Sequence, residues 1–99
     1  MKYPLTWDEA KQQSNLQKHG LDFSDAVEVL ESRYRMDTKV IRQGEMRIQS
    51  ISYVTGVLAV LTVIHIERDH ITRIISFRHA STHERETYYD WLENKYDDS

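Results

Sequence analysis

The first third of the chain has the spacing of two short helices. Thr6 is followed three residues later by Glu9, the pattern of a capping box, so we expect a helix that begins at about Trp7. Gly20 stands where a glycine commonly ends such a helix. Apolar residues with helical spacing then predict a second helix over roughly residues 23–32. The chain is therefore expected to begin with two helices joined by a tight turn.

The middle of the chain alternates between apolar and polar residues, as strands do. Thr55-Gly56 fits a two-residue hairpin turn, and residues 67–69 form a charged turn. The strands themselves are predicted over residues 34–44, 47–54, 57–66 and 71–77. Because none of the links between consecutive strands is long enough for a parallel crossover, we expect a four-stranded antiparallel sheet. The third strand is apolar on both faces, so it should lie at the centre, with helices covering one side.

The last part of the chain predicts a third helix. Ser81 and Glu84 form a second capping box, and an apolar stripe with helical spacing begins at Tyr88. The elements together predict an α+β fold, with two N-terminal helices, the four-stranded antiparallel sheet and a C-terminal helix. The 99 residues are expected to form a single domain, with a short acidic tail from about residue 93.

Composition narrows the class of protein. Hydrophobic residues make up 39% of the chain, enough for one core. There is no cysteine, which excludes disulfides, thiolate metal ligands and cysteine nucleophiles. The N-terminal segment lacks the apolar run of a signal peptide, and the longest apolar stretch, Val57–Ile66, is too short to span a bilayer. We therefore expect a soluble, cytoplasmic protein with no membrane partner.

The net charge of −3 conceals a strong asymmetry along the chain. Residues 39–85 hold seven Lys and Arg against four Asp and Glu, together with four of the five histidines. Residues 86–99 hold one basic residue against five acidic residues. Because the local field decides whether a polyanion can dock, the middle of the chain can accept one and the tail would repel one.

Polar and basic residues share one face of the first predicted helix. Positions i, i+4, i+7 and i+8 of this face are held by Lys11, Asn15, Lys18 and His19. The spacing brings two ammonium groups, an amide and an imidazole together. The alternative is a solvated helix face, which is what polar stripes usually are.

Two arginines lie in or next to the last predicted strand. Arg73 and Arg78 must each reach a carboxylate, a phosphate or solvent, and Ser76 lies between them. The alternative is an ordinary surface arginine, or an ion pair with a carboxylate such as that of Glu45. Five positions separate the two arginines, so strict alternation points them to opposite faces unless a bulge intervenes. Arg47 on the second strand is a third candidate.

His79 and His83 raise the question of a metal site. The second capping box places a helix start between them, so the two imidazoles do not share one helical face. No third ligand has a suitable spacing, and we expect neither a metal nor another cofactor. No segment matches a phosphate-binding glycine loop, a nucleophile elbow or a pair of catalytic carboxylates.

Three segments of the chain resemble the BrnT family of bacterial toxins. The family's N-terminal pattern, W-D-x-x-K-x-x-x-N-x-x-K-H-G-x-x-F, is matched by Trp7-Asp8-Glu9-Ala10-Lys11, Asn15, Lys18-His19-Gly20 and Phe23. Its E-x-R resembles Glu45-Met46-Arg47. Residues 73–85 resemble its R-I-I-S-A-R-x-A-x-x-x-E-R, with Phe77 in place of the usual alanine. The resemblance runs from about residue 4 to residue 89.

The resemblance implies a RelE-like toxin fold, metal-independent cleavage of RNA, and neutralisation by a cognate antitoxin of the BrnA type. It also implies that toxin and antitoxin form a hetero-oligomer, which binds operator DNA only through the antitoxin. A ribonuclease that works without a metal needs a base for the 2′-OH, an acid for the leaving oxygen and cations for the phosphate.

These needs assign a role to each candidate residue. His19 is the hypothesised acid or base, since imidazole titrates near neutral pH. The cations of the catalytic site are then Lys11, Arg47, Arg73 and Arg78. Substrate contacts are assigned to Asn15, Lys18, Ser76 and His79, with His79 as the second choice for proton transfer. Two alternatives stay open: a binding module without catalysis that docks an acidic antitoxin segment, and a regulator that contacts operator DNA.

Overall fold

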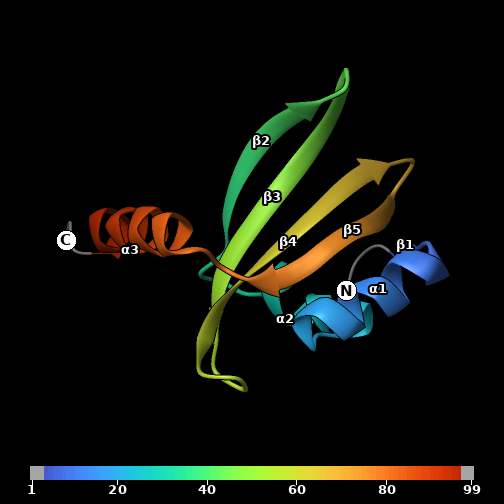
Figure 1. Ribbon diagram of the computed structural model, residues 1–99. Helices are drawn as coiled ribbons and strands as arrows, with labels where there is room; N and C mark the ends of the chain where they lie inside the picture. Colours follow the sequence, from blue (N-terminus) through green and yellow to red (C-terminus); the bar gives the residue numbers. More distant parts are fainter. Residues whose placement is uncertain (1–3, 97–99) are drawn as a thin grey trace.

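The computed structural model describes residues 4–96 as helices packed on a single five-stranded sheet (Figure 1). In chain order the elements are β1 (Leu5–Trp7), α1 (Glu9–His19), the 3₁₀-helix η1 (Phe23–Ala26), α2 (Val27–Leu30), β2 (Met36–Arg42), β3 (Glu45–Val54), β4 (Ala59–Arg68), β5 (Ile71–His79) and α3 (Thr82–Tyr96). The strands lie in the order β1-β5-β4-β3-β2. The α+β fold is confirmed, and β4, the third predicted strand, lies at the centre as expected.

The prediction of a four-stranded antiparallel sheet is wrong because of β1. Strands β2 to β5 do form an antiparallel meander, but Leu5–Trp7 adds a fifth strand parallel to β5. The capping box expected at Thr6 and Glu9 is not what starts α1. Asp8 caps the helix instead, and its Oδ1 accepts a hydrogen bond from the backbone N–H of Lys11 at 3.1 Å. A parallel pair needs a long connection, and most of the chain lies between β1 and β5.

The turn after α1 forms as predicted, but the next helix is shorter. Gly20 adopts a φ of 70° and donates its N–H to the carbonyl of Leu16 at 2.8 Å. The 3₁₀-helix η1 and the single turn α2 then end at Leu30 rather than near residue 32. The hydroxyl of Ser32 accepts a hydrogen bond from the N–H of Tyr34 at 3.1 Å, a local turn that replaces further helical bonds.

Both predicted hairpin turns differ in extent from the observed turns. β3 ends at Val54 and β4 begins at Ala59, so a four-residue turn replaces the expected two-residue turn at Thr55-Gly56. The charged turn expected over residues 67–69 is also shifted, because β4 continues to Arg68. The link to β5 is Asp69-His70, with φ values of 53° and 62°, the conformation of a hairpin turn that matches the strand twist.

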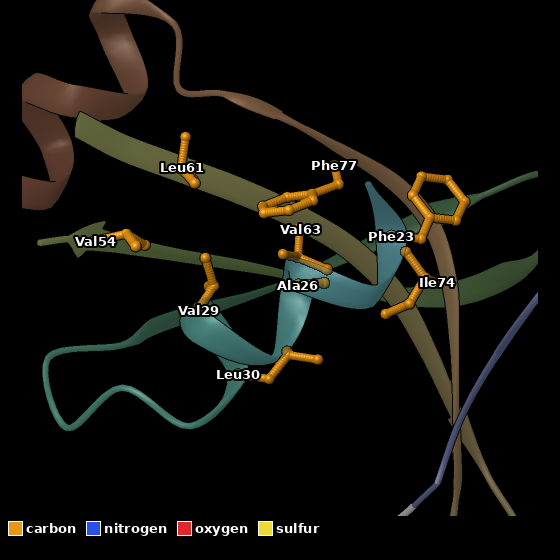
Figure 2. Packing of buried hydrophobic residues seen from close by; sticks show 9 residues of the cluster. All are labelled: Phe23, Ala26, Val29, Leu30, Val54, Leu61, Val63, Ile74 and Phe77. Atoms are coloured by element: carbon orange, nitrogen blue, oxygen red, sulfur yellow. The ribbon is translucent and has the colours of Figure 1, made fainter. Parts of the chain in front are cut away.

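Two apolar clusters lie on opposite faces of the sheet. The larger packs η1 and α2 against β3, β4 and β5 (Figure 2), and contains Phe23, Ala26, Val29, Leu30, Val54, Leu61, Val63, Ile74 and Phe77. The smaller lies under α3 and contains Met36, Ile51, Val60, Ala80 and Tyr88. Helices therefore cover parts of both faces, and the expectation that they cover one side only is wrong.

The start of α3 follows the predicted capping box. The backbone N–H of Ser81 donates to Glu84 Oε1 at 2.9 Å, and the N–H of Glu84 donates to Ser81 Oγ at 3.1 Å. Figure 1 shows α3 leading away from the sheet, on the side opposite α1. The helix runs to Tyr96, so the first part of the predicted acidic tail is helical, and residues 97–99 lie outside the described residues. Over residues 4–96, no helix is long and apolar enough to cross a membrane.

Candidate functional site

A bulge in β5 decides where its two arginines point. Ile64 of β4 pairs with Ser76, whereas the next residue, His65, pairs with Ile74, so Ile75 is an extra residue in β5. Strict alternation is broken at this point, and Arg73 and Arg78 come to the same face of the sheet. The bulge that the two arginines need in order to share a site is therefore present.

The strand register adds further basic residues to this face. It is the face opposite the larger apolar cluster, because Ile74 and Phe77 pack into that cluster and point the other way. The cross-strand partners of β2, β3 and β4 then place five arginines together. We call this surface the arginine face, and it carries Arg42, Arg47, Arg68, Arg73 and Arg78.

Three hollows open on this side of the molecule and meet at Ile75, which lines all of them. The first, of about 360 Å³, has four basic and two acidic lining residues, Lys11, Arg47, Arg68, Arg73, Glu45 and Asp69. The second, of about 270 Å³, is lined by Val40, Arg42, Arg47, Gln49, Ile64, Ile75, Ser76 and Arg78. The third, of about 200 Å³, is lined by Lys11, Ser14, Asn15, Lys18, His19, Ile75 and Ser76. The structure thus brings the predicted face of α1 next to the arginine face.

The first hollow contains two cations without a partner, Lys11 and Arg73, beside two arginines that pair with Glu45. The Nε atom of Arg47 is buried and makes no hydrogen bond to residues 4–96, although it forms an ion pair with Glu45 Oε1 at 3.5 Å. Within the same described part of the chain, the side chains of Lys11 and Arg73 have neither an ion pair nor a hydrogen bond. A buried donor without a hydrogen bond and two unpaired cations around one hollow are the arrangement that an anion such as phosphate satisfies.

Residues 7–84 match the family model described as a ribonuclease toxin, BrnT, of a type II toxin–antitoxin system. The chain belongs to the BrnT family. A comparison with curated proteins gives no match for this chain. The family is one of ribonuclease toxins that act with an antitoxin partner, and the match covers the helix α1, the arginine face and the capping box of α3.

In this member of the BrnT family, the amide of Asn15 is already occupied. Its side chain is 6% exposed, and Nδ2 donates to the carbonyls of Leu21 at 3.2 Å and Phe77 at 2.7 Å. Oδ1 accepts from the N–H of Phe77 at 3.1 Å. β1 stops pairing at Ile74, so the amide takes the place of a neighbouring strand for the backbone just beyond the bulge. These bonds hold α1 to β5 at the edge of the third hollow, which Asn15 also lines.

Glu84 is the site residue that sequence reasoning missed. Its carboxylate accepts two hydrogen bonds from the guanidinium of Arg78, at 2.7 and 2.9 Å, and others from Gln49 at 2.6 Å and Thr62 at 3.1 Å. The Arg78 guanidinium lowers the pKa of Glu84 to about 2, and Glu84 in turn raises the pKa of Arg78. The sequence signals for Glu84 were its places in the capping box and in the family pattern over residues 73–85, and neither indicated a contact to Arg78.

Two histidines lie away from the hollows. His79 is exposed and follows Arg78 directly in β5, so it points to the opposite face of the sheet. His83 is exposed on the first turn of α3. The structure therefore does not bring His79 to the arginine face, and among the predicted imidazoles only His19 lines a described hollow. Within residues 4–96, no three side chains of His, Cys, Asp or Glu gather as metal ligands do.

His65, Ser50 and Glu67 form a chain of hydrogen bonds that no sequence pattern indicated. His65 Nε2 lies 2.8 Å from Ser50 Oγ, and its Nδ1 lies 2.7 Å from Glu67 Oε2. The order resembles a nucleophile–base–acid series, but both Ser50 and His65 are 0% exposed and Ser50 donates to Asp37 at 2.6 Å. No substrate reaches such a hydroxyl, so this group is part of the core. Burial lowers the pKa of His65.

Proposed function

We propose that the chain is an endoribonuclease that cleaves RNA at the arginine face without a metal ion. The observation that carries the proposal is the first hollow, in which Lys11, Arg47 and Arg73 surround a site for an anion. Phosphate contacts from such cations supply most of the affinity for a nucleic-acid backbone. Arg47 and Arg78 add less charge than Lys11 and Arg73, because Glu45 and Glu84 pair with them. Membership of the BrnT family supports the ribonuclease activity.

The proposed reaction uses the substrate's own nucleophile. A base removes the proton from the 2′-OH, the oxygen attacks the adjacent phosphorus, and the bond from phosphorus to the 5′-oxygen breaks. An acid gives a proton to the leaving 5′-oxygen, which leaves a 2′,3′-cyclic phosphate and a 5′-hydroxyl. Lys11, Arg47 and Arg73 stabilise the negative charge that builds up on the phosphate. His19 provides one of the two proton transfers, with Lys18 and Ser76 beside it as substrate contacts.

We propose further that the cognate antitoxin of the BrnA type inhibits the enzyme by covering the arginine face with an acidic segment. The unpaired cations Lys11 and Arg73 of the first hollow favour such a partner through charge complementarity. The toxin and antitoxin together would form the complex that contacts operator DNA through the antitoxin.

The test is to incubate the purified chain, freed of antitoxin, with labelled RNA in excess EDTA and to analyse the 3′ ends. Fragments that end in a 2′,3′-cyclic phosphate are the expected result. Fragments that form only after a divalent cation is restored would contradict the metal-independent mechanism. Intact RNA with a folded protein would favour the binding module without catalysis.

A further inference from the structure

The second hollow of the arginine face differs in chemistry from the first. Its floor is apolar, with Val40, Ile64 and Ile75 among the lining residues. The guanidinium of Arg78, which lines this hollow, already donates two hydrogen bonds to Glu84. A cation compensated in this way is a weak ligand for phosphate, but the flat face of its guanidinium is still able to stack on a planar group.

The polar groups of this hollow are held rigidly. Arg78 is fixed by its two-pronged pairing with Glu84. The same carboxylate accepts a hydrogen bond from Gln49 Nε2 at 2.6 Å, which orients that amide. Gln49 lines the hollow, and its Oε1 accepts no hydrogen bond from residues 4–96 and is not among their fully buried unsatisfied atoms. A planar guanidinium held in one position, an apolar floor and an amide oxygen that accepts no hydrogen bond from residues 4–96 are groups that recognise a nucleobase.

We propose that the second hollow is a nucleobase site, so that the substrate is single-stranded RNA. An unpaired base stacks on the guanidinium of Arg78 over Ile75, and a donor on its edge bonds to Gln49 Oε1. The first hollow, which shares Arg47 and Ile75 with the second, takes the neighbouring phosphate. A base inside a duplex is stacked and cannot enter. The proposal rests on the proposed function, since it assumes that RNA binds to the arginine face.

The first experiment uses the wild-type chain alone. Its cleavage position is mapped on a short unstructured RNA, and the same RNA is then made with a single abasic ribonucleotide on one or the other side of that position. One of the two abasic RNAs is expected to be cut about tenfold more slowly or worse, because stacking of one base commonly contributes this much. Equal rates on all three RNAs would overturn the nucleobase site while leaving the ribonuclease intact.

A matched pair of variants then locates the site. Arg78→Lys keeps a cation for Glu84 but removes the planar guanidinium. We therefore expect the cleavage rate of the full RNA to fall about fivefold or more, and the rate of the sensitive abasic RNA to fall little further. The cleavage rate of Arg73→Lys, a substitution in the first hollow, should fall by the same factor on both RNAs. If Arg78→Lys also loses the same factor on both, the base does not stack on Arg78. Thermal unfolding of each variant checks that it is folded.

Binding separates this proposal from the proposed function. If the full RNA is bound but not cut, the cleavage proposal fails, and the fluorescence anisotropy of the labelled full and abasic RNAs is compared instead. Weaker binding of one abasic RNA supports the nucleobase site, and equal binding overturns it. If neither RNA binds, both proposals fail.

Discussion

His19 and Asn15 lie four residues apart on α1, and the proposed chemistry gives them different tasks. His19 is exposed at the edge of the third hollow, where an imidazole can exchange protons with bound RNA. His19→Ala is expected to lower the single-turnover cleavage rate at least a hundredfold, since general acid–base catalysis contributes about that much. RNA binding should change less than threefold. His83→Ala, which removes an exposed imidazole from α3, serves as the control, and full activity of His19→Ala would reject the assignment.

Asn15 is expected to act through the shape of the site. Asn15→Asp keeps the size of the side chain but removes both donors, so the carbonyl of Phe77 loses its 2.7 Å hydrogen bond. We expect a loss of about 1–3 kcal/mol in the free energy of unfolding, measured by urea denaturation. Cleavage should fall as well, because the bulge that aligns Arg73 with Arg78 loses its support.

The matched control for this variant is Gln13→Glu. Gln13 is an exposed amide on the same helix, with one hydrogen bond to Glu9 at 3.1 Å. Its unfolding free energy should change by less than about 0.5 kcal/mol. Equal effects of the two substitutions would mean that added charge on α1, and not the bond to Phe77, is responsible.

At the scale of elements, α3 is tied to the sheet by the ion pair of Glu84 and Arg78. The pKa of Glu84 is lowered to about 2 from 4.5. The ionised carboxylate therefore contributes fully to the free energy of unfolding above pH 4.5, and this contribution is lost as the pH falls toward 2. The shift corresponds to at most about 3 kcal/mol. The gap in unfolding free energy between the wild type and Glu84→Gln should therefore narrow when urea denaturation is repeated at pH 3.5 instead of pH 6. A gap independent of pH would contradict the pairing.

Elements with local signals were predictable from the sequence, and those with distant partners were not. The capping box of Ser81 and Glu84 and the glycine end of α1 depend on neighbouring residues alone. β1 is only three residues long, and its partner lies more than sixty residues away, so nothing local distinguishes it from a helix start. Asp8 caps α1 instead of Thr6, because Thr6 lies within the extended backbone of β1.

The features of the site also divide into those that local sequence patterns predicted and those that they did not. The N-terminal pattern placed Lys11, Lys18 and His19 on one helical face, because helical spacing follows from sequence. The bulge at Ile75 could only be named as a condition, since two consecutive isoleucines do not show which of them leaves the ladder. The face of His79 depends on the same bulge: its neighbour Arg78 faces the hollow, so His79 faces away.

At the scale of the molecule, a net charge of −3 coexists with a surface that is expected to bind a polyanion. Three phosphate contacts, from Lys11, Arg47 and Arg73, would give a slope of about −2 for the logarithm of the RNA affinity against the logarithm of salt concentration. A fourfold rise in salt should therefore weaken binding about twentyfold. Anisotropy titrations at several salt concentrations measure the slope. A flat response would remove the phosphate site.

The most direct measurement compares a lysine beside the arginine face with a lysine on the opposite face of the sheet. Lys11 lines the first hollow, whereas Lys39 is exposed on β2 and points away from the arginine face. Lys11→Gln and Lys39→Gln change the net charge equally, and their cleavage of labelled RNA is followed in EDTA. We predict at least a tenfold loss for Lys11→Gln and a change of less than twofold for Lys39→Gln. Equal activities would contradict the placement of RNA cleavage on the arginine face.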